Sequence, residues 1–432
     1  MNITIFHYHL NPGGVTRIIE SQVAALRQSY PEITIQIITG YCENIEYYNN
    51  FNIKVNIIKE INYLQNREYN NNELKDIFNT IYNSIKSLIS DNEILHVHNL
   101  NLGKNPVFTM VINKFFEEGH LIINHAHDFA EDRPQNIEFI NRIITQYNKN
   151  PENILYPDND KYRVCVLNKF DYKRVVNYGI SDLRVFLLPN PVFISEINDS
   201  SSKMQLRNKI ANTFNLDTQK SIITYPVRVI RRKNIGELIL LAKLFEDKCS
   251  FLVTMAPRNP EEIEFYENWK KFCVENNINI TFEAGEMLDF ETIVTGSDYC
   301  ITTSIKEGFG MSFLEPWLLG TPVVGRNISS VTDDIKSYGI KFPLLYNELK
   351  VPFFNDNIDF KELAPERQQA VILEIFQGTL NKNTIFTLNN YLVDFPPKIS
   401  QSIIINNQNI IKKEFSLNKY AERLLEAYRA FS

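Results

Sequence analysis

The sequence predicts an α/β protein made of two doubly wound domains. Short apolar runs typical of buried strands alternate with longer segments of helical periodicity, and this alternation stops near the middle of the chain and then restarts. A length of 432 residues also exceeds what one ordinary hydrophobic core organises. Alternation of this kind produces parallel sheets that are covered on both faces by helices.

The first half of the chain shows the alternation most clearly. Apolar runs predict buried strands at 3–9, 33–40, 53–60, 93–98, 120–127, 163–168 and 185–190. Apolar residues at helical spacing predict helices at about 14–29, 73–90 and 105–118, and a further helix that ends near Tyr178.

The second half follows a polar, serine-rich stretch at 193–204, which predicts a linker. Strands are then expected at 220–229, 249–256, 278–285, 298–304 and 321–325. Helices are expected between them at 234–246, 260–275 and 312–319.

The last hundred residues are less regular. The pattern weakens over 345–412, where one helix near 366–380 is clear, and 417–431 forms a strongly amphipathic helix. We expect this last helix to cross back to the first domain. The predicted domains are therefore residues 1–192 together with 415–432, and residues 205–414.

Composition argues against several classes of protein. A net charge of −6 provides no general attraction for nucleic acid or an anionic membrane, although it leaves peripheral membrane contact open. No signal-peptide pattern precedes the first strand, and no uncharged apolar run approaches the ~18 residues of a membrane span, so we expect a cytoplasmic protein. The cysteines form no CxxC pair, which argues against a zinc site and a disulfide framework: Cys42, Cys165, Cys249, Cys273 and Cys300.

The segment 304–324, SIKEGFGMSFLEPWLLGTPVV, carries the strongest chemical signal. Glu307 precedes a Gly-Phe-Gly loop, and Glu315 follows eight positions later in an apolar helix. Glycine permits positive φ and close approach of the backbone to a ligand, and a helix N-terminus attracts phosphate. Two carboxylates around such an anion seat suit a phosphorylated sugar.

A second signal is the sequence YPVRVIRRKNIGEL at 225–238. Arg228 ends a predicted strand and Lys233 starts the next helix. Ligands of doubly wound sheets bind at the carboxyl ends of the strands, where two cations would hold a diphosphate. A solvated basic turn is the other interpretation, and it is the one we expect for Arg231 and Arg232.

Together these segments resemble the nucleotide-sugar glycosyltransferases of family 4, which have the GT-B fold of two Rossmann-like domains facing a cleft. The matching residues are Arg228 with Lys233, Glu307 with Glu315, and the strand 298–304 before them. The resemblance covers the second domain to about residue 330 and, more loosely, the first.

The resemblance implies a role for each matching residue. Arg228 and Lys233 would hold the donor diphosphate, Glu307 the hydroxyl groups of the donor sugar, and Glu315 the ribose. The backbone around the sugar and the phosphates would come from Gly308, Phe309, Gly310, Met311 and Ser312. Similar enzymes retain the anomeric configuration and need no metal or other cofactor. The only DxD spacing, Asp158 to Asp160, lies in a polar loop and is interpreted as solvated charge.

The first domain carries two weaker signals. Gly13 and Gly14 form a strand-to-helix turn, which in similar enzymes lies against the donor phosphates and the acceptor. His127 follows a strand and matches the histidine that lies near the reacting sugar in the family, although a lone histidine at a strand end is usually structural. Asp128 is expected to anchor the loop of His127.

The acceptor must be inferred from the first domain as well. Arg17, Lys104 and Arg133 would suit an anionic acceptor, although a plain surface lysine is the safer interpretation of Lys104. The pairing of YPVRVIRRKNIGE with NLGKNP and HDFAEDRP resembles enzymes that build glycosylated glycerate or phosphoglycerate. His96 and His98 share one strand face, but no third ligand has the spacing of a metal site, so we expect core or loop roles.

The predicted function is retaining, metal-independent transfer of a hexose from a UDP-glucose or GDP-mannose type donor to an acceptor hydroxyl. The acceptor hydroxyl would give its proton to the leaving phosphate oxygen. Two alternatives remain open. A nucleotide-sugar epimerase would need no acceptor, and a non-catalytic nucleotide-sugar binding protein would bind the donor without turnover.

Overall fold

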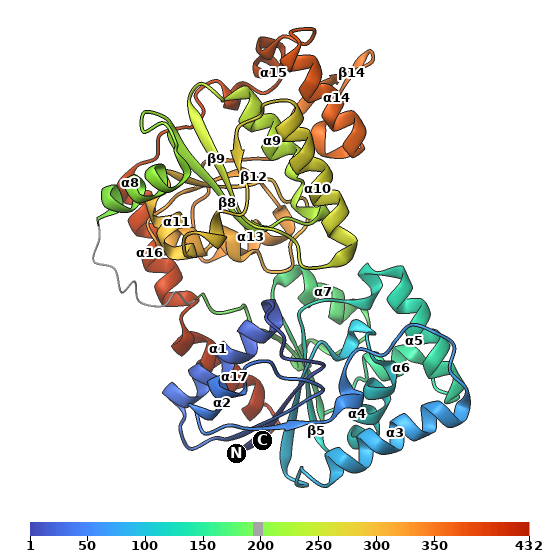
Figure 1. Cartoon of the computed structure of the whole chain (residues 1–432). Helices are drawn as coiled ribbons and strands as arrows, with labels where there is room; N and C mark the ends of the chain where they lie inside the picture. The colour runs from blue at the N-terminus through green and yellow to red at the C-terminus, as the bar shows by residue number, and fades with distance from the viewer. Residues whose placement is uncertain (193–201, 432) are drawn as a thin grey trace. The chain divides into compact units, whose positions relative to one another are not determined.

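The chain divides into two units, each built on one parallel sheet (Figure 1). The computed structural model describes residues 1–192 and 202–431. The N-terminal unit is Met1–Phe193 with Phe415–Ser432, and the C-terminal unit is Ile194–Glu414. Most of the predicted linker, residues 193–201, lies outside the described residues.

The N-terminal sheet has the strand order β3-β2-β1-β4-β5-β6-β7, and every pair in it is parallel. Its strands are β1 (Asn2–His7), β2 (Thr34–Thr39), β3 (Lys54–Ile57), β4 (Glu93–His98), β5 (Leu121–Ala126), β6 (Tyr162–Val166) and β7 (Val185–Leu187). The order reverses between β1 and β4. The carboxyl ends of these two strands therefore form a switch point, where doubly wound sheets bind ligands.

Helices cover both faces of this sheet. They are α1 (Gly14–Ser29), α2 (Ile45–Asn49), α3 (Asn71–Lys86), α4 (Pro106–Glu117), α5 (Pro134–Gln146), α6 (Pro151–Leu155) and α7 (Lys169–Asn177). The last helix, α17 (Leu417–Arg429), lies beside α1 (Figure 1). It buries Tyr420, Leu424 and Tyr428 in the core that contains Ile3 and Ile5 of β1. The prediction that the C-terminal helix returns to the first domain is confirmed.

The C-terminal sheet has the order β10-β9-β8-β11-β12-β13, again with all pairs parallel. Its strands are β8 (Ser221–Arg228), β9 (Cys249–Met255), β10 (Ile280–Thr281), β11 (Tyr299–Thr302), β12 (Val323–Arg326) and β13 (Leu345–Tyr346). The helices around it are α8 (Lys203–Phe214), α9 (Ile235–Leu244), α10 (Pro260–Glu275), α11 (Phe290–Gly296), α12 (Glu315–Leu318), α13 (Ser329–Ser337) and α16 (Gln401–Glu414).

The weakly patterned stretch 345–412 belongs to the core of the C-terminal unit. It forms an antiparallel hairpin of β14 (Lys350–Phe353) and β15 (Asp356–Asp359), followed by α14 (Pro365–Phe376) and α15 (Lys382–Leu388). Val351 and Val371 are fully buried in one cluster with Leu238 of α9. The stretch therefore covers α9, the helix that follows the predicted diphosphate residues Arg228 and Lys233.

Two predicted elements are shorter than expected. The strand predicted at 278–285 is reduced to β10, because Glu283 has a positive φ of 58° and turns the chain into a 3₁₀ turn. The helix predicted at 312–319 is a 3₁₀ turn at Met311–Phe313 followed by the four residues of α12. Pro316 has no N–H to bond back to Ser312, so an α-helix cannot run through this point.

Two features bear on the composition, namely the state of the cysteines and the apolar length of the helices. All five cysteines are buried and free of disulfides. Across residues 1–192 and 202–431, no helix combines the length and the apolar composition needed to cross a membrane.

Candidate active site

The first part of the site is the turn after β8. Arg228 ends that strand, and residues Arg231–Lys233 form a 3₁₀ turn before α9. Asn234 adopts a left-handed φ of 50° and so redirects the chain into the helix. This turn places Lys233 at the carboxyl edge of the sheet, where the sequence predicted a cation.

The loop after β11 is bound to this turn by backbone and side-chain contacts. The backbone N–H of Ile305 donates to the carbonyl of Arg232 at 2.9 Å. The Thr303 hydroxyl donates to the carbonyls of Lys233 and Asn234 at 3.0 and 3.1 Å. Two segments about 70 positions apart in the sequence are thus fixed side by side.

Glu307 is the centre of the charged group formed by these segments. Its carboxylate accepts from Nζ of Lys233 and, at 2.5 Å, from Nη1 of Arg232. Burial would raise the pKa of Glu307, but the charges of Lys233 and Arg232 hold it below the ordinary value. Arg232 is solvent-exposed, with 43% of its side chain accessible, as the interpretation of a solvated turn predicted, but the loop after β11 also brings Glu307 to it.

Arg228 lies on the same edge without a carboxylate partner among the described residues. Its Nε is buried and has no hydrogen-bond partner. Burial, and after it the charge of Arg258, lower the pKa of Arg228. A bound anion would offset this repulsion between the two guanidinium groups. Arg258 carries no signal in the sequence, because it stands in the loop between β9 and α10 with no motif around it.

The Gly-Phe-Gly loop completes the donor side. Gly310 has a φ of +82°, and a Cβ there would come within 2.7 Å of Val331 and 2.9 Å of Phe313, so only glycine fits. The Ser312 hydroxyl is buried without a partner, and Glu315 is 6% exposed. The predicted phosphate seat on a helix N-terminus needs correction, because a 3₁₀ turn and not an α-helix follows Gly310.

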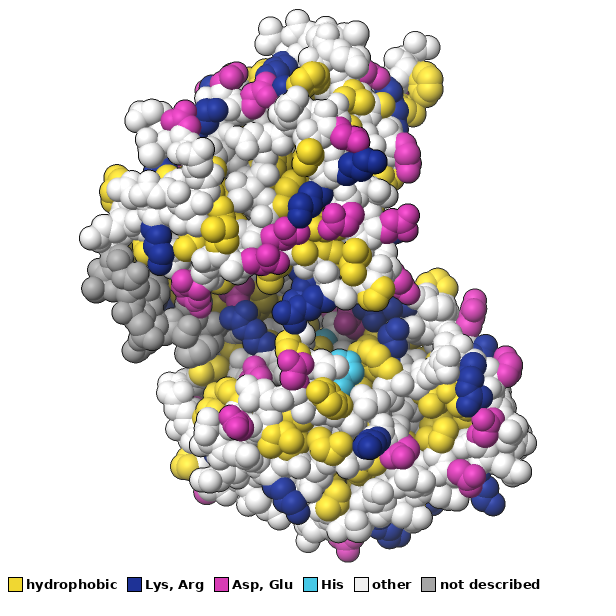
Figure 2. All heavy atoms as spheres, viewed as in Figure 1, with side chains coloured by type: hydrophobic (Ala, Val, Ile, Leu, Met, Phe, Trp, Pro, Cys, Tyr) yellow, Lys and Arg dark blue, Asp and Glu magenta, His cyan; other side chains and the backbone are white. Residues whose placement is uncertain are grey.

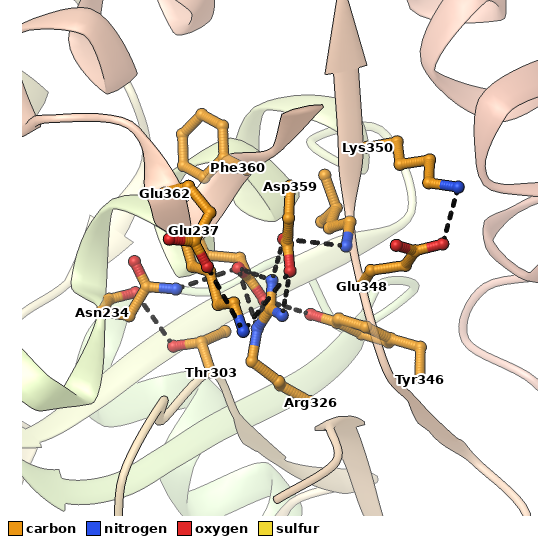
Figure 3. A network of polar contacts seen from close by, with 12 residues as sticks. Asn234, Glu237, Thr303, Arg326, Tyr346, Glu348, Lys350, Asp359, Phe360 and Glu362 are labelled. Atoms are coloured by element: carbon orange, nitrogen blue, oxygen red, sulfur yellow. Dashed lines mark hydrogen bonds and ion pairs between the residues drawn. The ribbon is translucent and has the colours of Figure 1, made fainter. Parts of the chain in front are cut away.

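A buried ion network lies behind the turn after β8 (Figure 3). Nη2 of Arg326 is 2.5 Å from Glu237 Oε2 and 2.7 Å from Asp359 Oδ1. Tyr346 donates to Glu237 at 2.8 Å, and Asn234 Nδ2 donates to it at 2.9 Å. The hairpin residue Asp359 is therefore linked through Arg326 and Glu237 to Asn234, which directly follows Lys233.

The predicted residues of the N-terminal unit lie in two places on that unit. Gly13 and Arg17 line a hollow of about 440 Å³ whose wall also includes Glu20 and Glu43. A Cβ on Gly14 would meet no atom within 4 Å, and neither glycine has a positive φ. The backbone conformation therefore does not require glycine here, whereas close approach of a ligand would.

His127 stands directly after β5 and is held there by Asn99 after β4. The Oδ1 atom of Asn99 accepts from the backbone N–H groups of His127 and Asp128 at 2.8 and 3.1 Å. Asp128 forms an ion pair with Arg133 at 3.2 Å, so it neutralises one predicted acceptor cation. Lys104 lies 5.7 Å from the ring centre of Tyr63.

The structure places a third histidine beside His96 and His98. A nitrogen of each of these and of His125 lie within 4.8 Å of one another, which is a spacing that could hold a metal ion. Spacing along the sequence does not show this third ligand, because the parallel pairing of β4 with β5 brings His125 to His98. The core role expected for His96 and His98 agrees with their exposure of 0%. Hydrogen bonds already engage both ring nitrogens of His96 and of His98.

Other charged features lie away from these groups. Asp158 and Asp160 both pair with Arg184 on the surface, the second at 2.7 Å. A hollow of about 490 Å³ between α10 and α14 includes Arg231 but none of the predicted donor residues. Figure 2 shows charged side chains of both signs over the surface of both units.

Comparison with known proteins gives a consistent result. Residues 207–343 match the family model described as glycosyl transferases group 1. A mannosylglucosyl-3-phosphoglycerate synthase of Petrotoga mobilis is 31% identical over 98% of this chain and 90% of its own length. A mannosylglucosylglycerate synthase of the same organism is 24% identical over 80% of this chain and 85% of its own length.

Solved structures share the fold. Anabaena Alr3699/HepE, solved in complex with UDP and glucose, superposes with a TM-score of 0.64 at 13% identity over all of both chains. A sucrose-phosphate synthase of Thermosynechococcus elongatus superposes with a TM-score of 0.60 at 14% identity over 99% of this chain and 98% of its own. At these identities the likeness concerns the fold.

Proposed function

Because this chain belongs to the group 1 glycosyl transferases and is a glycosyltransferase that uses a nucleotide sugar, we propose that it transfers a hexose from a UDP-glucose or GDP-mannose type donor to a glycerate-type acceptor. The proposed reaction retains the anomeric configuration and needs no metal ion. The relative from Petrotoga, whose name includes 3-phosphoglycerate, supports the acceptor class.

One observation carries the donor side of the proposal. Arg228, Lys233 and Glu307 lie at one edge of the C-terminal sheet, with the Nε of Arg228 buried and unpaired. A diphosphate would supply the anion for Arg228 and Arg258 and would share Lys233 with Glu307. The second carboxylate oxygen of Glu307 would then accept from sugar hydroxyl groups.

The proposed chemistry depends on charge stabilisation and needs no protein nucleophile. Arg228 and Lys233 would stabilise the negative charge that builds on the leaving phosphate, since fixed cations in a dry site favour such charge. The sugar would become oxocarbenium-like at C1. The acceptor hydroxyl would attack from the same face and pass its proton to the departing phosphate oxygen.

The acceptor side of the proposal is based on the N-terminal unit. Arg17, at the hollow beside Gly13, and Lys104 would attract the carboxylate or phosphate of a glycerate derivative. Arg133 is a weaker candidate, because Asp128 already pairs with it.

The test is a matrix of donors and acceptors with the full chain. UDP-glucose and GDP-mannose are each incubated with glycerate, 3-phosphoglycerate, glucosylglycerate and glucosyl-3-phosphoglycerate, and nucleotide diphosphate release and product mass are measured. We expect one donor to turn over only when a glycerate-type acceptor is present, with equal rates in EDTA. Proton NMR of the product should show retention at the new glycosidic carbon.

Three outcomes would contradict parts of the proposal. Turnover of a nucleotide sugar without acceptor would favour an epimerase. Thermal stabilisation by a nucleotide sugar without any turnover would favour a binding protein. Complete loss of rate in EDTA, restored by Mg²⁺, would remove metal independence.

A further inference from the structure

The N-terminal unit contains a cluster of buried histidines that the proposed chemistry does not use. Six of the seven histidines of the chain occur on β1, β4 and β5 or directly after β1 or β5. His96, His98 and His125 are 0% exposed and His127 is 8% exposed. Burial lowers the pKa of His127 and of His96 to about 3, so these rings are neutral at pH 7.

A neutral imidazole has one donor nitrogen and one acceptor nitrogen, so each hydrogen bond that it makes fixes the other one. Two non-histidine side chains connect the rings. Gln22 comes from α1, is 0% exposed, and reaches both His98 and Tyr428. Tyr428 comes from α17 and is 3.0 Å from His96 Nδ1.

The amide orientation of Gln22 sets the direction of the first half of the chain of hydrogen bonds. Its Oε1 is 2.8 Å from His98 Nε2, so this nitrogen carries the proton and donates. His98 Nδ1 is then an acceptor, and His127 Nε2, 2.9 Å away, must donate to it. The proton of His127 is therefore on Nε2, and its Nδ1 carries a lone pair.

The second half follows from the other end of the same amide. Gln22 Nε2 donates to the Tyr428 oxygen at 2.9 Å, so the Tyr428 hydroxyl donates to His96 Nδ1. His96 Nε2 then donates to His125 Nδ1 at 3.3 Å. His125 Nε2 ends the chain as a buried nitrogen without a partner among the described residues. All four histidines thus carry their proton on Nε2.

The outer end of the chain is where a ligand would be bound. Among the described residues, His127 Nδ1 has no hydrogen-bond partner, and it is not fully enclosed. Asn99 fixes the backbone of His127 at the carboxyl edge of the sheet. An Nδ1 lone pair at this edge accepts from a hydroxyl group and repels another acceptor.

We infer that Gln22 is a positioning residue, which acts through His98 to hold His127 as a fixed acceptor for a hydroxyl group of the ligand at this edge, while Tyr428 extends the chain from Gln22 to His96 and His125. The part of this inference that concerns a ligand hydroxyl rests on the proposed function. The assignment of the His127 tautomer does not rest on the proposed function. Reversing every donor would also connect the rings, but it would place the proton on Nδ1 of all four histidines and make His127 a donor.

The experiment measures the tautomers directly. The full chain is labelled with ¹⁵N only in histidine, and each ring is assigned with a His→Gln variant. Protonated and unprotonated ring nitrogens resonate far apart, so each ring reports its tautomer. We expect His96, His98, His125 and His127 all to be protonated on Nε2, and His7 on Nδ1, because His7 Nδ1 donates to the carbonyl of His98.

Two variants break the chain at different points. Gln22→Met removes the acceptor of His98, so His98 and His127 should become tautomer mixtures. Tyr428→Phe removes the nearer of the two donors to His96 Nδ1 and leaves only Gln22 Nε2 at 3.4 Å. The preference of His96 and His125 for the Nε2 tautomer should therefore weaken, while His127 keeps its proton on Nε2. The matched control is Tyr420→Phe in the same helix, whose hydroxyl is buried without a partner, and it should change no tautomer.

Activity supplies the second measurement. With the donor and acceptor that turn over, Gln22→Met should lower kcat/KM about tenfold, the scale of losing one hydrogen bond to a neutral group, and Tyr420→Phe should leave it unchanged. A wild-type chain with the four Nε2 protons but no turnover would contradict the proposed function and leave the hydrogen-bond chain intact. Protons on Nδ1, an unchanged His127 in Gln22→Met, or stoichiometric zinc bound to these rings would overturn the inference.

Discussion

The two units each hold a buried polar network behind the edge that carries the predicted site residues, and the two networks differ in kind. In the C-terminal unit Arg326 is 1% exposed and lies between the carboxylates of Glu237 and Asp359. In the N-terminal unit four neutral imidazoles, Gln22 and Tyr428 form a directed chain. A buried ion network therefore lies behind the predicted diphosphate residues, and a directed chain of hydrogen bonds lies behind His127.

The two networks constrain the residues in front of them in different ways. The buried Arg326 guanidinium holds its carboxylate partners by charge and through a fixed fork of N–H groups, which suits a turn that must place Lys233 against phosphate. A chain of neutral hydrogen-bonding groups carries little net charge, but it specifies which nitrogen presents a lone pair. Such a nitrogen discriminates between a hydroxyl group that can donate and a group that can only accept.

Arg326→Met should give the largest loss of stability. It leaves Glu237 and Asp359 buried without their shared cation, and removal of one partner of a buried ion pair costs about 3–5 kcal/mol. Urea unfolding of the full chain measures this. The control Lys336→Met breaks an exposed pair with Asp333 and should cost less than about 1 kcal/mol. Equal losses in both variants would show that the network contributes no more than a surface pair.

Lys233→Ala should affect catalysis more than stability. Losing one cation that stabilises the leaving phosphate is expected to lower kcat/KM by about 10²–10³-fold, or roughly 2.7–4 kcal/mol. Steady-state kinetics with the active donor and acceptor measure this, and Lys271→Ala on the exposed side of α10 serves as the control. Near-normal turnover would remove Lys233 from its proposed role.

Acid should weaken the N-terminal unit through its histidines. Unfolded histidines bind a proton below about 6.5, whereas the pKa of His7, His96 and His127 in the fold is about 3. The unfolded state therefore binds more protons between these values, and stability falls as the pH falls. From pH 7 to pH 5 one such histidine contributes a loss of roughly 2 kcal/mol.

Amide hydrogen exchange at pH 7 and pH 5, corrected for the intrinsic rate, measures this acid effect. Protection of β4 and β5 should fall, and protection of β8 and β9 should fall less. Equal protection at both pH values in β4 and β5 would contradict the neutral state of the cluster.

Tyr428→Phe should have the smallest effect, about 1 kcal/mol on the free energy of unfolding, because Gln22 Nε2 and His96 Nδ1 lose the hydroxyl between them and keep only their mutual contact at 3.4 Å. Tyr420→Phe removes a buried hydroxyl that has no partner and should be neutral or slightly stabilising. Urea unfolding of both variants gives the comparison. A larger loss in Tyr420→Phe would contradict the assigned network.

Much of the fold could be predicted from local patterns in the sequence. Helix α1 and helix α10 have the predicted bounds of 14–29 and 260–275, because clear periodicity and local start signals define both. The wrong elements were those in which a local feature interrupted the pattern, namely the positive φ of Glu283 and the proline at position 316. In the stretch 345–412 only the helix predicted near 366–380 could be recognised, and it is α14 (Pro365–Phe376). The other short elements of this stretch carry no clear pattern, because they are stabilised by packing in the core of the C-terminal unit.

The sequence by itself determined the family, the two parallel sheets and the residue types that carry the proposed chemistry, because these depend on periodicity and on short motifs such as the Glu307 loop. The tertiary structure was needed to show that Arg232 faces Glu307, that the charge of Arg258 acts on Arg228, and that His125 joins His96 and His98. Each of these contacts joins side chains on different strands or loops. Strand order and register set such distances, and spacing along one chain does not contain them.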